Sequence, residues 1–383
     1  MTEQNVPSDL APPELDRVRL GFVPLTDCAP LVVAEMLNLG KAHGLTIELR
    51  RQASWAAVRD KLLSGELDAA HSLYGLVYGV QLGLGGPQAD MTILMTLNRN
   101  GQAISVSNRL SDLLGQGVSL SRAFDALGRK PVFAQTFPTG THAMWLNYWL
   151  AAQGIDPLCD VESVVIAPPQ MADAMAHEEI DGFCAGEPWH TVAHAKGVGR
   201  MSIASGAIWP DHPEKALACR RDFAALYPNT AKALIRTMLD ACRWLETPEN
   251  RQLAAGWLAA NRYLGLMPDM ILPSMTATSA QRGSPVRFFG SDGMNAPLPE
   301  DGLWFLSQYR RWGMLKHGVE WMRVAREVSG TDLFNAAAAG FNLERKFNAP
   351  AKLVDGVIWD GRDAASYADA FAISRCRPET QPS

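Results

Sequence analysis

Short apolar segments alternate with helical segments through the first 200 residues of the chain. The apolar segments predicted as strands in the first run are 18–23, 46–51, 67–72, 91–97 and 102–107. A second run of the same kind covers about 119–196, and the chain from 228 to about 345 is mainly helical in pattern. Alternation of this kind is typical of α/β domains with a largely parallel sheet and right-handed crossovers. The sequence therefore predicts two α/β lobes followed by a helical return.

The predicted lobes are joined by crossing strands, so their boundaries are discontinuous in sequence. We expect lobe 1 to combine 17–104 with 222–345, and lobe 2 to cover 105–221. Residues 1–16, which are polar and rich in proline, are predicted to form a disordered arm. Residues 346–383 carry few periodic signals, and we expect them to wrap over lobe 1.

Composition excludes several classes of function. The chain has 383 residues, of which 47% are hydrophobic and 20% charged, which suits a compact globular protein with a large core. A net charge of −5 argues against a basic surface that would bind nucleic acid or an anionic membrane. Six cysteines are scattered without a C-x-x-C pair, which argues against a zinc ribbon or a disulfide framework and fits reduced thiols.

The amino-terminal sequence bears on where the protein works. MTEQNVPSDLAPPELDRVRL lacks the basic and apolar regions of a secretory signal peptide. No stretch approaches the roughly eighteen uncharged apolar residues needed to span a bilayer. From these features we expect a cytoplasmic protein that makes no direct contact with nucleic acid or membrane.

The segment 130–157 has the form of a small anion site. A short apolar strand is followed by the turn FPTG and by a helix predicted to begin near Thr141. Unpaired N–H groups point out of a helix's first turn, where the helix dipole favours negative charge. His142 lies in that turn and adds a side-chain donor. An ordinary strand–helix connection explains the same pattern, because many such connections contain glycine and threonine.

Six motifs resemble one known family in content and in order. They are GFVPLTDCAPLVVA (21–34), QASWAAVRDKL (52–62), LNRNGQAISVSN (97–108), FPTGTHAMWLNYWLAAQGIDP (137–157), DGFCAGEPW (181–189) and DHPEKALACRRDF (211–223). Together they resemble the nitrate-binding proteins related to NrtA, a family that includes the bicarbonate-binding CmpA and the nitrate sensor NasS. The resemblance implies a periplasmic-binding-protein type II fold, in which two α/β lobes close at a hinge over a ligand.

The amino terminus carries no lipobox cysteine, so the resemblance points to the NasS type. It implies a cytosolic nitrate or nitrite sensor that holds a NasT-like antiterminator, an RNA-binding protein with an ANTAR domain, and releases it when the anion binds. The alternative is the nitrate-binding component of an ABC transporter. Bicarbonate is a further alternative and calls for a calcium site, for which Glu214 and Glu187 are the candidates. An enzyme of thiamine-pyrimidine synthesis shares the architecture, but its cysteine-rich iron motif is absent from this sequence. We expect no catalysis, metal or cofactor.

Four side chains are the main candidates for binding nitrate, which is planar, singly charged and weakly basic. Such a site needs one positive charge, neutral donors in fixed directions and apolar walls. The resemblance assigns the charge to Lys215, although a surface lysine is the commoner alternative. Gln102 and His142 match family motifs and would donate from a strand start and a helix start. Trp55 offers an indole N–H and a ring wall, but buried tryptophans are most often core residues.

Gly140, Thr141 and Gly186 are predicted to offer backbone N–H groups to the anion. Two other groups of residues are less persuasive. Glu187, His190 and His194 share a helical face but lack the spacing of a zinc site. His71 is predicted to be a core histidine, because no nucleophile or acid lies at a recognisable spacing from it. With four heavy atoms at about −1.5 kcal/mol each, nitrate should bind with a Kd on the order of tens of micromolar. We expect Lys215→Ala to abolish binding and to leave the fold intact.

Overall fold

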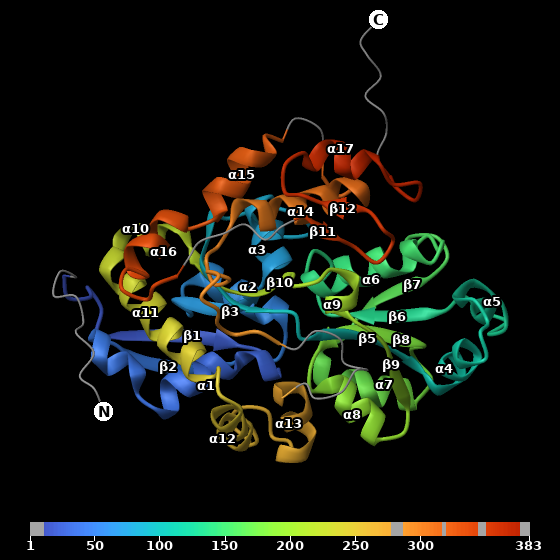
Figure 1. Cartoon of the computed structure of the whole chain (residues 1–383), viewed down its shortest axis with the longest axis horizontal. Helices are drawn as coiled ribbons and strands as arrows, with labels where there is room; N and C mark the ends of the chain where they lie inside the picture. Colours follow the sequence, from blue (N-terminus) through green and yellow to red (C-terminus); the bar gives the residue numbers. More distant parts are fainter. Residues whose placement is uncertain (1–10, 277–285, 316–318, 344–349, 376–383) are drawn as a thin grey trace, which may run out of the picture.

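The computed structural model describes residues 11–276, 286–315, 319–343 and 350–375 and contains two α/β lobes, each built on a five-stranded sheet (Figure 1). The first sheet has the order β2-β1-β3-β10-β4 and the second the order β7-β6-β8-β5-β9. Strands of the first are β1 (Arg17–Phe22), β2 (Thr46–Arg51), β3 (Ala69–Leu73), β4 (Met91–Arg99) and β10 (Pro213–Arg220). Strands of the second are β5 (Gln102–Ser107), β6 (Val132–Gln135), β7 (Glu162–Val165), β8 (Gly182–Gly186) and β9 (Gly199–Ala204).

Both sheets are mixed, which differs from the largely parallel sheet predicted. β1 runs parallel to β2 and β3, whereas β10 runs antiparallel to β3 and β4. In the second sheet β6 runs parallel to β7 and β8, whereas β5 runs antiparallel to β8 and β9. The reason is that β5 and β10 each carry the chain from one lobe into the other, so they enter a sheet from the opposite end to their neighbours.

The chain crosses between the lobes at two points that lie together. Asn100 and Gly101 separate β4 from β5, and Asp211 and His212 precede β10. Asn100, Gly101 and Asp211 have φ values of 59°, 92° and 58°, a left-handed conformation that Gly, Asn and Asp tolerate best. The Asn100 N–H donates to the His212 carbonyl at 3.1 Å, so the two crossings are hydrogen-bonded to each other.

These crossings place the ends of the second lobe near 101 and 211, whereas we had expected 105 and 221. The difference at the carboxyl side is larger because β10, with its motif HPEKALACR, was not predicted as a strand. Its Lys215 and Ala216 pair with Leu73 and Ser72 of β3 in the first sheet. Helices that follow β10 in the described part of the chain pack against strands of the same sheet.

Helices cover both faces of each sheet. In the first lobe α1 (Ala29–Met36) and α11 (Pro228–Trp244) pack with the side chains of Val18, Leu20 and Phe22 on one face, while α2 (Trp55–Ser64) and α3 (Tyr74–Gln81) cover the other. The helices of the second lobe are α4 (Asn108–Gly115), α5 (Leu120–Asp125), α6 (Thr141–Ala152), α7 (Met171–Ala176), α8 (Trp189–Ala195) and α9 (Ser205–Ile208). The return comprises α10 (Arg221–Leu226), α12 (Pro248–Leu258), α13 (Pro268–Thr276), α14 (Pro299–Arg311), α15 (Trp321–Val328) and α16 (Thr331–Ala337).

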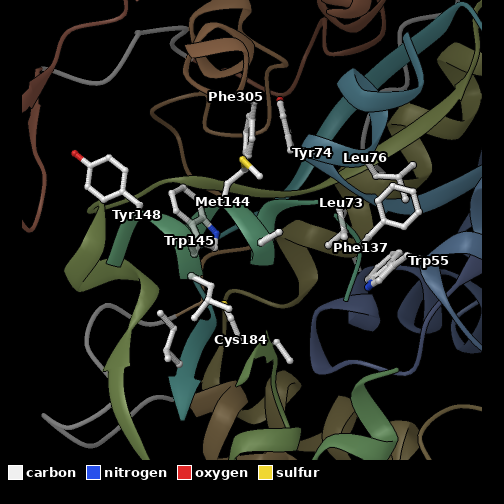
Figure 2. Packing of buried hydrophobic residues seen from close by; sticks show 14 of the residues in the cluster. Trp55, Leu73, Tyr74, Leu76, Phe137, Met144, Trp145, Tyr148, Cys184 and Phe305 are labelled. Carbon is white, nitrogen blue, oxygen red and sulfur yellow. The ribbon is translucent and has the colours of Figure 1, made fainter. Parts of the chain in front are cut away.

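One apolar cluster continues from the first lobe into the second. Figure 2 shows part of it, with Trp55 and Tyr74 from the first lobe, Trp145 from α6 and Phe305 from α14. The Trp145 ring lies 6.2 Å from that of Phe305 between centroids. Packed cores tolerate few voids, so polar groups enclosed at this interface are shielded from water.

The terminal segments differ from what we expected. Residues 1–10 lie outside the described residues, but Glu14 accepts hydrogen bonds from Asn229 N (3.0 Å) and Thr230 N (2.7 Å), so the end of the predicted disordered arm is docked on α11. The carboxyl-terminal strands β11 (Ala351–Lys352) and β12 (Ile358–Trp359) and helix α17 (Ala364–Asp369) contact both lobes and do not wrap the first alone (Figure 1). Val354 N donates to the Ile208 carbonyl at 2.9 Å, and Asp369 pairs with Arg310 of α14.

Candidate functional site

A cluster of buried polar side chains lies where the two lobes meet. Asp27, His71, Glu214 and Lys215 come from the first lobe, and Gln102, His142 and Trp145 come from the second. Each of the seven is 3% exposed or less. Of the four main candidates predicted from sequence, the structure brings Lys215, Gln102 and His142 into one network of hydrogen bonds and places Trp55 at its edge.

Lys215 on β10 supplies the positive charge of the cluster. Its ammonium Nζ lies 2.8 Å from Asp27 Oδ2 and 2.8 Å from Glu214 Oε1. Asp27 is held in turn by His71, whose Nε2 lies 2.8 Å from Oδ1. Lys215 is fully buried, and the alternative of a solvated surface lysine is wrong.

Gln102 joins the two lobes. Its Nε2 donates to Asp27 Oδ2 at 2.8 Å, and its Oε1 accepts from His142 Nε2 at 2.8 Å. The other ring nitrogen of His142, Nδ1, lies 2.6 Å from Thr136 Oγ1. Neutral His142 with its proton on Nε2 satisfies every one of these contacts, because Thr136 then donates to Nδ1.

Trp55 closes the first-lobe side of the cluster. Ser54 caps its helix by accepting from Ala57 N at 3.2 Å, and Gly65 ends the helix at a φ of 78°, as the sequence predicted. Lys215 Nζ lies 5.7 Å from the centre of the Trp55 ring. The Trp55 Nε1 group is buried and has no hydrogen-bond partner among the described residues. A buried donor without a partner is unfavourable, so this N–H is available to a ligand.

The charges in the cluster are shifted by burial and by one another. Burial alone would raise the pKa of Asp27, but the Lys215 ammonium and the hydrogen bond from His71 lower it below its ordinary value. Burial opposes the charge on Lys215, yet the two carboxylates raise its pKa above the usual lysine value. Lys215 and Asp27 are therefore both ionised at neutral pH.

For Glu214 and His142, burial shifts the pKa toward the uncharged form of the side chain. Burial raises the pKa of Glu214, and the Lys215 ammonium opposes this only in part. Its Oε2 accepts from Trp145 Nε1 at 3.0 Å, and its Oε1 lies 3.5 Å from His142 Nε2. Burial, with Lys215 nearby, lowers the pKa of His142 well below its usual value, so the ring is neutral. Lys215 is thus the one positively charged side chain in the cluster at neutral pH.

The three positions predicted to offer backbone N–H groups differ in what they can do. Gly140 uses its N–H within the turn, donating to the Phe137 carbonyl at 2.8 Å, and it serves as the N-cap of α6, which begins at Thr141. Thr141 is the first helical residue, and its buried Oγ1 has no partner among the described residues. Gly186 pairs with Gln102, and a Cβ there would lie 2.9 Å from Gln102 Oε1, so the glycine makes room for the amide.

Sequence reasoning missed Asp27, Glu214 and Trp145 as members of this network and set His71 aside. Asp27 lies in an apolar turn between a strand and a helix, PLTDCAP, and a lone acid in such a setting signals a buried partner. Glu214 was considered only as a calcium ligand. In the described residues no group of three or more His, Cys, Asp or Glu side chains could hold a metal ion. Glu187 instead accepts from Thr191 N at 3.1 Å, and His190 Nδ1 lies 2.7 Å from Ser105 Oγ.

Known proteins resemble this chain along most of its length. The model of the NMT1-like family matches residues 11–259. The nitrate/nitrite binding protein NrtA of Synechocystis sp. is 31% identical, with 94% of this chain and 86% of that protein covered. The bicarbonate transport ATP-binding protein CmpC of Synechococcus elongatus is 34% identical over 94% of this chain, which corresponds to 56% of CmpC. The crystal structure of the periplasmic nitrate-binding protein NrtA from Synechocystis superposes with a TM-score of 0.87 at 30% identity, covering 94% of this chain and all of that one.

Proposed function

Since the chain belongs to the NMT1-like family and is related to NrtA, we propose that it binds nitrate or nitrite between its two lobes. One observation carries the proposal. A buried ammonium, Lys215, lies at the lobe interface 5.7 Å from the centre of the Trp55 ring, whose indole N–H has no partner in the described part of the chain. An oxyanion at this position would accept from both groups.

The chemistry of the surrounding groups suits a monovalent anion. Lys215 provides a full charge, while Trp55, Gln102 and neutral His142 are uncharged donors. The ring of Trp55 and the apolar cluster around it exclude water, which strengthens hydrogen bonds to a charged ligand. The amide of Gln102 and the ring of His142 are engaged with each other at 2.8 Å, so binding would exchange this contact for contacts to the anion.

The anion would act by a population shift between an open and a closed arrangement. Groups from both lobes surround the site, so only a form with the lobes together offers all donors at once. A ligand shifts such an equilibrium only by its differential affinity for the two forms. The hydrogen-bonded crossings at Asn100 and His212 are the natural hinge, because the chain passes from one lobe to the other at both of them.

Binding can serve two roles, and the relatives favour delivery to an importer. NrtA is named a nitrate/nitrite binding protein, and NrtC of Synechocystis sp., which is 32% identical over 93% of this chain and 55% of its own length, is named a nitrate import ATP-binding protein. In this role the closed form would present the anion to the membrane components of an ABC transporter. In the described parts of the chain itself, no helix has both the length and the apolar character to span a bilayer.

A cytosolic sensor is the second candidate. In this role the closed form would change a surface recognised by a NasT-like antiterminator with an ANTAR domain, and nitrate or nitrite would release that partner. The observation in its favour is that five described cysteines, including the exposed Cys159, are free thiols. Exposed free thiols are more usual in a reducing compartment than in an oxidising one.

Calorimetric titration of the purified protein with nitrate, nitrite, bicarbonate and sulfate tests the binding proposal. Micromolar binding of nitrate or nitrite supports it, and no binding of either anion overturns it. Pull-down of the antiterminator with and without nitrate, together with fractionation of cells that express the protein from its native gene, separates the two roles. Bicarbonate with calcium would be the outcome favoured by the likeness to CmpC, although the described residues offer no metal cluster for it.

A further inference from the structure

The Lys215 ammonium faces two carboxylates, and this creates a problem for any anion that binds beside it. Asp27 Oδ2 and Glu214 Oε1 are each 2.8 Å from Nζ, and all three side chains are buried. If both acids are ionised, the three groups already carry a net charge of −1. A monovalent anion would bring the enclosed charge to −2, which is strongly unfavourable where water is excluded.

The two acids differ in how well they keep their charge. Asp27 accepts from Lys215, Gln102 and His71, so three donors stabilise its ionised form. Glu214 accepts from Lys215 and from Trp145 Nε1, a neutral donor. A carboxylate with fewer donors and no exposure takes up a proton more readily.

The titratable groups that face Glu214 come from every element packed around it. Lys215 is its neighbour on β10, His142 lies on α6, and His212 Nδ1 is 3.8 Å from Oε2 at the crossing. Asp27 is paired with the same Lys215 ammonium as Glu214, and His71 is hydrogen-bonded to Asp27. The charge of Glu214 also contributes to raising the pKa of Cys184 on β8. Burial keeps His71, His142 and His212 neutral by lowering the pKa of each, and it keeps the Cys184 thiol protonated by raising its pKa.

We propose that Glu214 takes up one proton from solvent when a monovalent oxyanion binds beside Lys215, so that anion affinity falls as pH rises. This inference rests on the proposed function and identifies the group that sets its pH dependence. Protonation restores the enclosed charge to −1 with the anion bound, and it turns Glu214 from an acceptor into an O–H donor. Nitrate has no proton to give to a carboxylate, so only the protonated acid can hydrogen-bond to it.

The same arrangement selects against divalent anions. Asp27 remains ionised in the complex, so one full carboxylate charge always accompanies the single ammonium. A monovalent anion then leaves a net charge of −1 in the enclosure, whereas sulfate leaves −2. We therefore expect sulfate to bind far more weakly than nitrate, although both accept hydrogen bonds from the same donors.

Glu214→Gln mimics the protonated acid, because its amide N–H₂ donates while its oxygen still accepts from Lys215. Glu187→Gln is the matched control: Glu187 is also buried, and its carboxylate accepts from Thr191 N at 3.1 Å and from Thr191 Oγ1 at 3.2 Å within the second lobe. Nitrate is the probe, since its charge is constant across the pH range.

The experiment measures the Kd for nitrate from pH 5.5 to 9 by calorimetry, in buffers of low and high ionisation enthalpy. For the parent protein and Glu187→Gln, Kd should rise by up to about tenfold per pH unit above the pKa of ligand-free Glu214, with up to one proton taken up from buffer. Glu214→Gln should bind with a Kd that is constant over the range. A parent Kd that does not vary with pH, or a pH dependence that persists in Glu214→Gln, overturns the inference. No binding at any pH would overturn the proposed function instead.

Discussion

The carboxylate of Asp27 and the amide of Gln102 meet across the interface between the lobes, with Gln102 Nε2 2.8 Å from Asp27 Oδ2. Through Asp27 this contact links Gln102 of the second lobe to Lys215 of the first. Closure of the second lobe onto the first therefore adds a donor to the carboxylate that holds the ammonium. Anion affinity and lobe closure should change together when any member of this chain of contacts is altered.

Replacing Lys215 alone should destabilise the protein, which revises the expectation of an intact fold. Lys215→Ala leaves the buried carboxylate of Asp27 without its main partner, and such a loss lowers the free energy of unfolding by about 3–5 kcal/mol. Lys215→Met combined with Asp27→Asn removes both charges and should recover most of that loss. Urea denaturation of the three proteins measures this, and equal stability of parent and Lys215→Ala would contradict it.

Trp55→Phe should separate the two functions of that residue. The phenyl ring keeps much of the apolar wall, while the N–H that lacks a partner is lost. Since a hydrogen bond to a charged group contributes about 1.5–3 kcal/mol, nitrate should bind roughly 10- to 100-fold more weakly. Thermal unfolding of the ligand-free protein should change little by comparison. A variant that binds nitrate as the parent does would show that the indole N–H does not contact the anion.

Gly186→Ala should weaken binding through Gln102. The added Cβ would lie 2.9 Å from Gln102 Oε1 and 3.0 Å from a methyl carbon of Leu25, so the amide must move. Gly256→Ala is the control, because a Cβ there meets nothing within 4 Å. Titration with nitrate should show several-fold weaker binding for Gly186→Ala and the parent value for Gly256→Ala. Parent affinity in both proteins would argue against a role for the Gln102 position.

Tyr148→Phe should loosen the carboxyl-terminal segment from the second lobe. The Tyr148 hydroxyl donates to Asp355 Oδ1 at 3.0 Å and lies 3.2 Å from the hydroxyl of Tyr367. Losing a bond to a charged acceptor should lower stability by about 1–2 kcal/mol and speed amide exchange in α17. Tyr227→Phe, which removes a hydroxyl at the N-cap of α11 in the first lobe, serves as control. Unchanged exchange in Tyr148→Phe would show that the hydroxyl does not hold the segment.

Glu214 should also impose a pH dependence on the stability of the ligand-free protein. Its pKa is raised in the folded state, so its contribution is fully present below the unfolded pKa of about 4.3 and is lost as pH rises through the folded value. The difference in unfolding free energy between the parent and Glu214→Gln isolates this effect from the buried histidines. The free energy of unfolding of the parent should fall relative to that of Glu214→Gln as pH rises above about 4.5. A difference that is constant with pH would mean that Glu214 titrates normally.

The two-lobe fold and the positions of most elements could be predicted from sequence because they follow from local signals. Ser54 and Gly65 bound α2 as expected, and β5 spans 102–107 as predicted. Strand direction could not be predicted in this way, since an antiparallel crossing strand such as β10 has the same apolar pattern as a parallel one. The hydrogen bond between Asn100 and His212 likewise depends on contacts distant in sequence.

The candidate site was predicted in part. Lys215, Gln102 and His142 were identified from motifs, and the structure brings them together. Asp27 was missed because its partner, Lys215, is 188 positions away, and no local pattern marks such a pair. For the same reason the sequence does not show that the Lys215 ammonium is paired with two acids, Asp27 and Glu214.

Calorimetric titration with nitrate of the parent protein and of the double variant Asp27→Asn/Lys215→Met tests the central claim most directly. The account predicts that the parent binds with a Kd on the order of tens of micromolar and that the double variant, which stays folded, does not bind. Equal binding by the two proteins would contradict it, because the anion would then be held without the buried ammonium at the interface between the lobes.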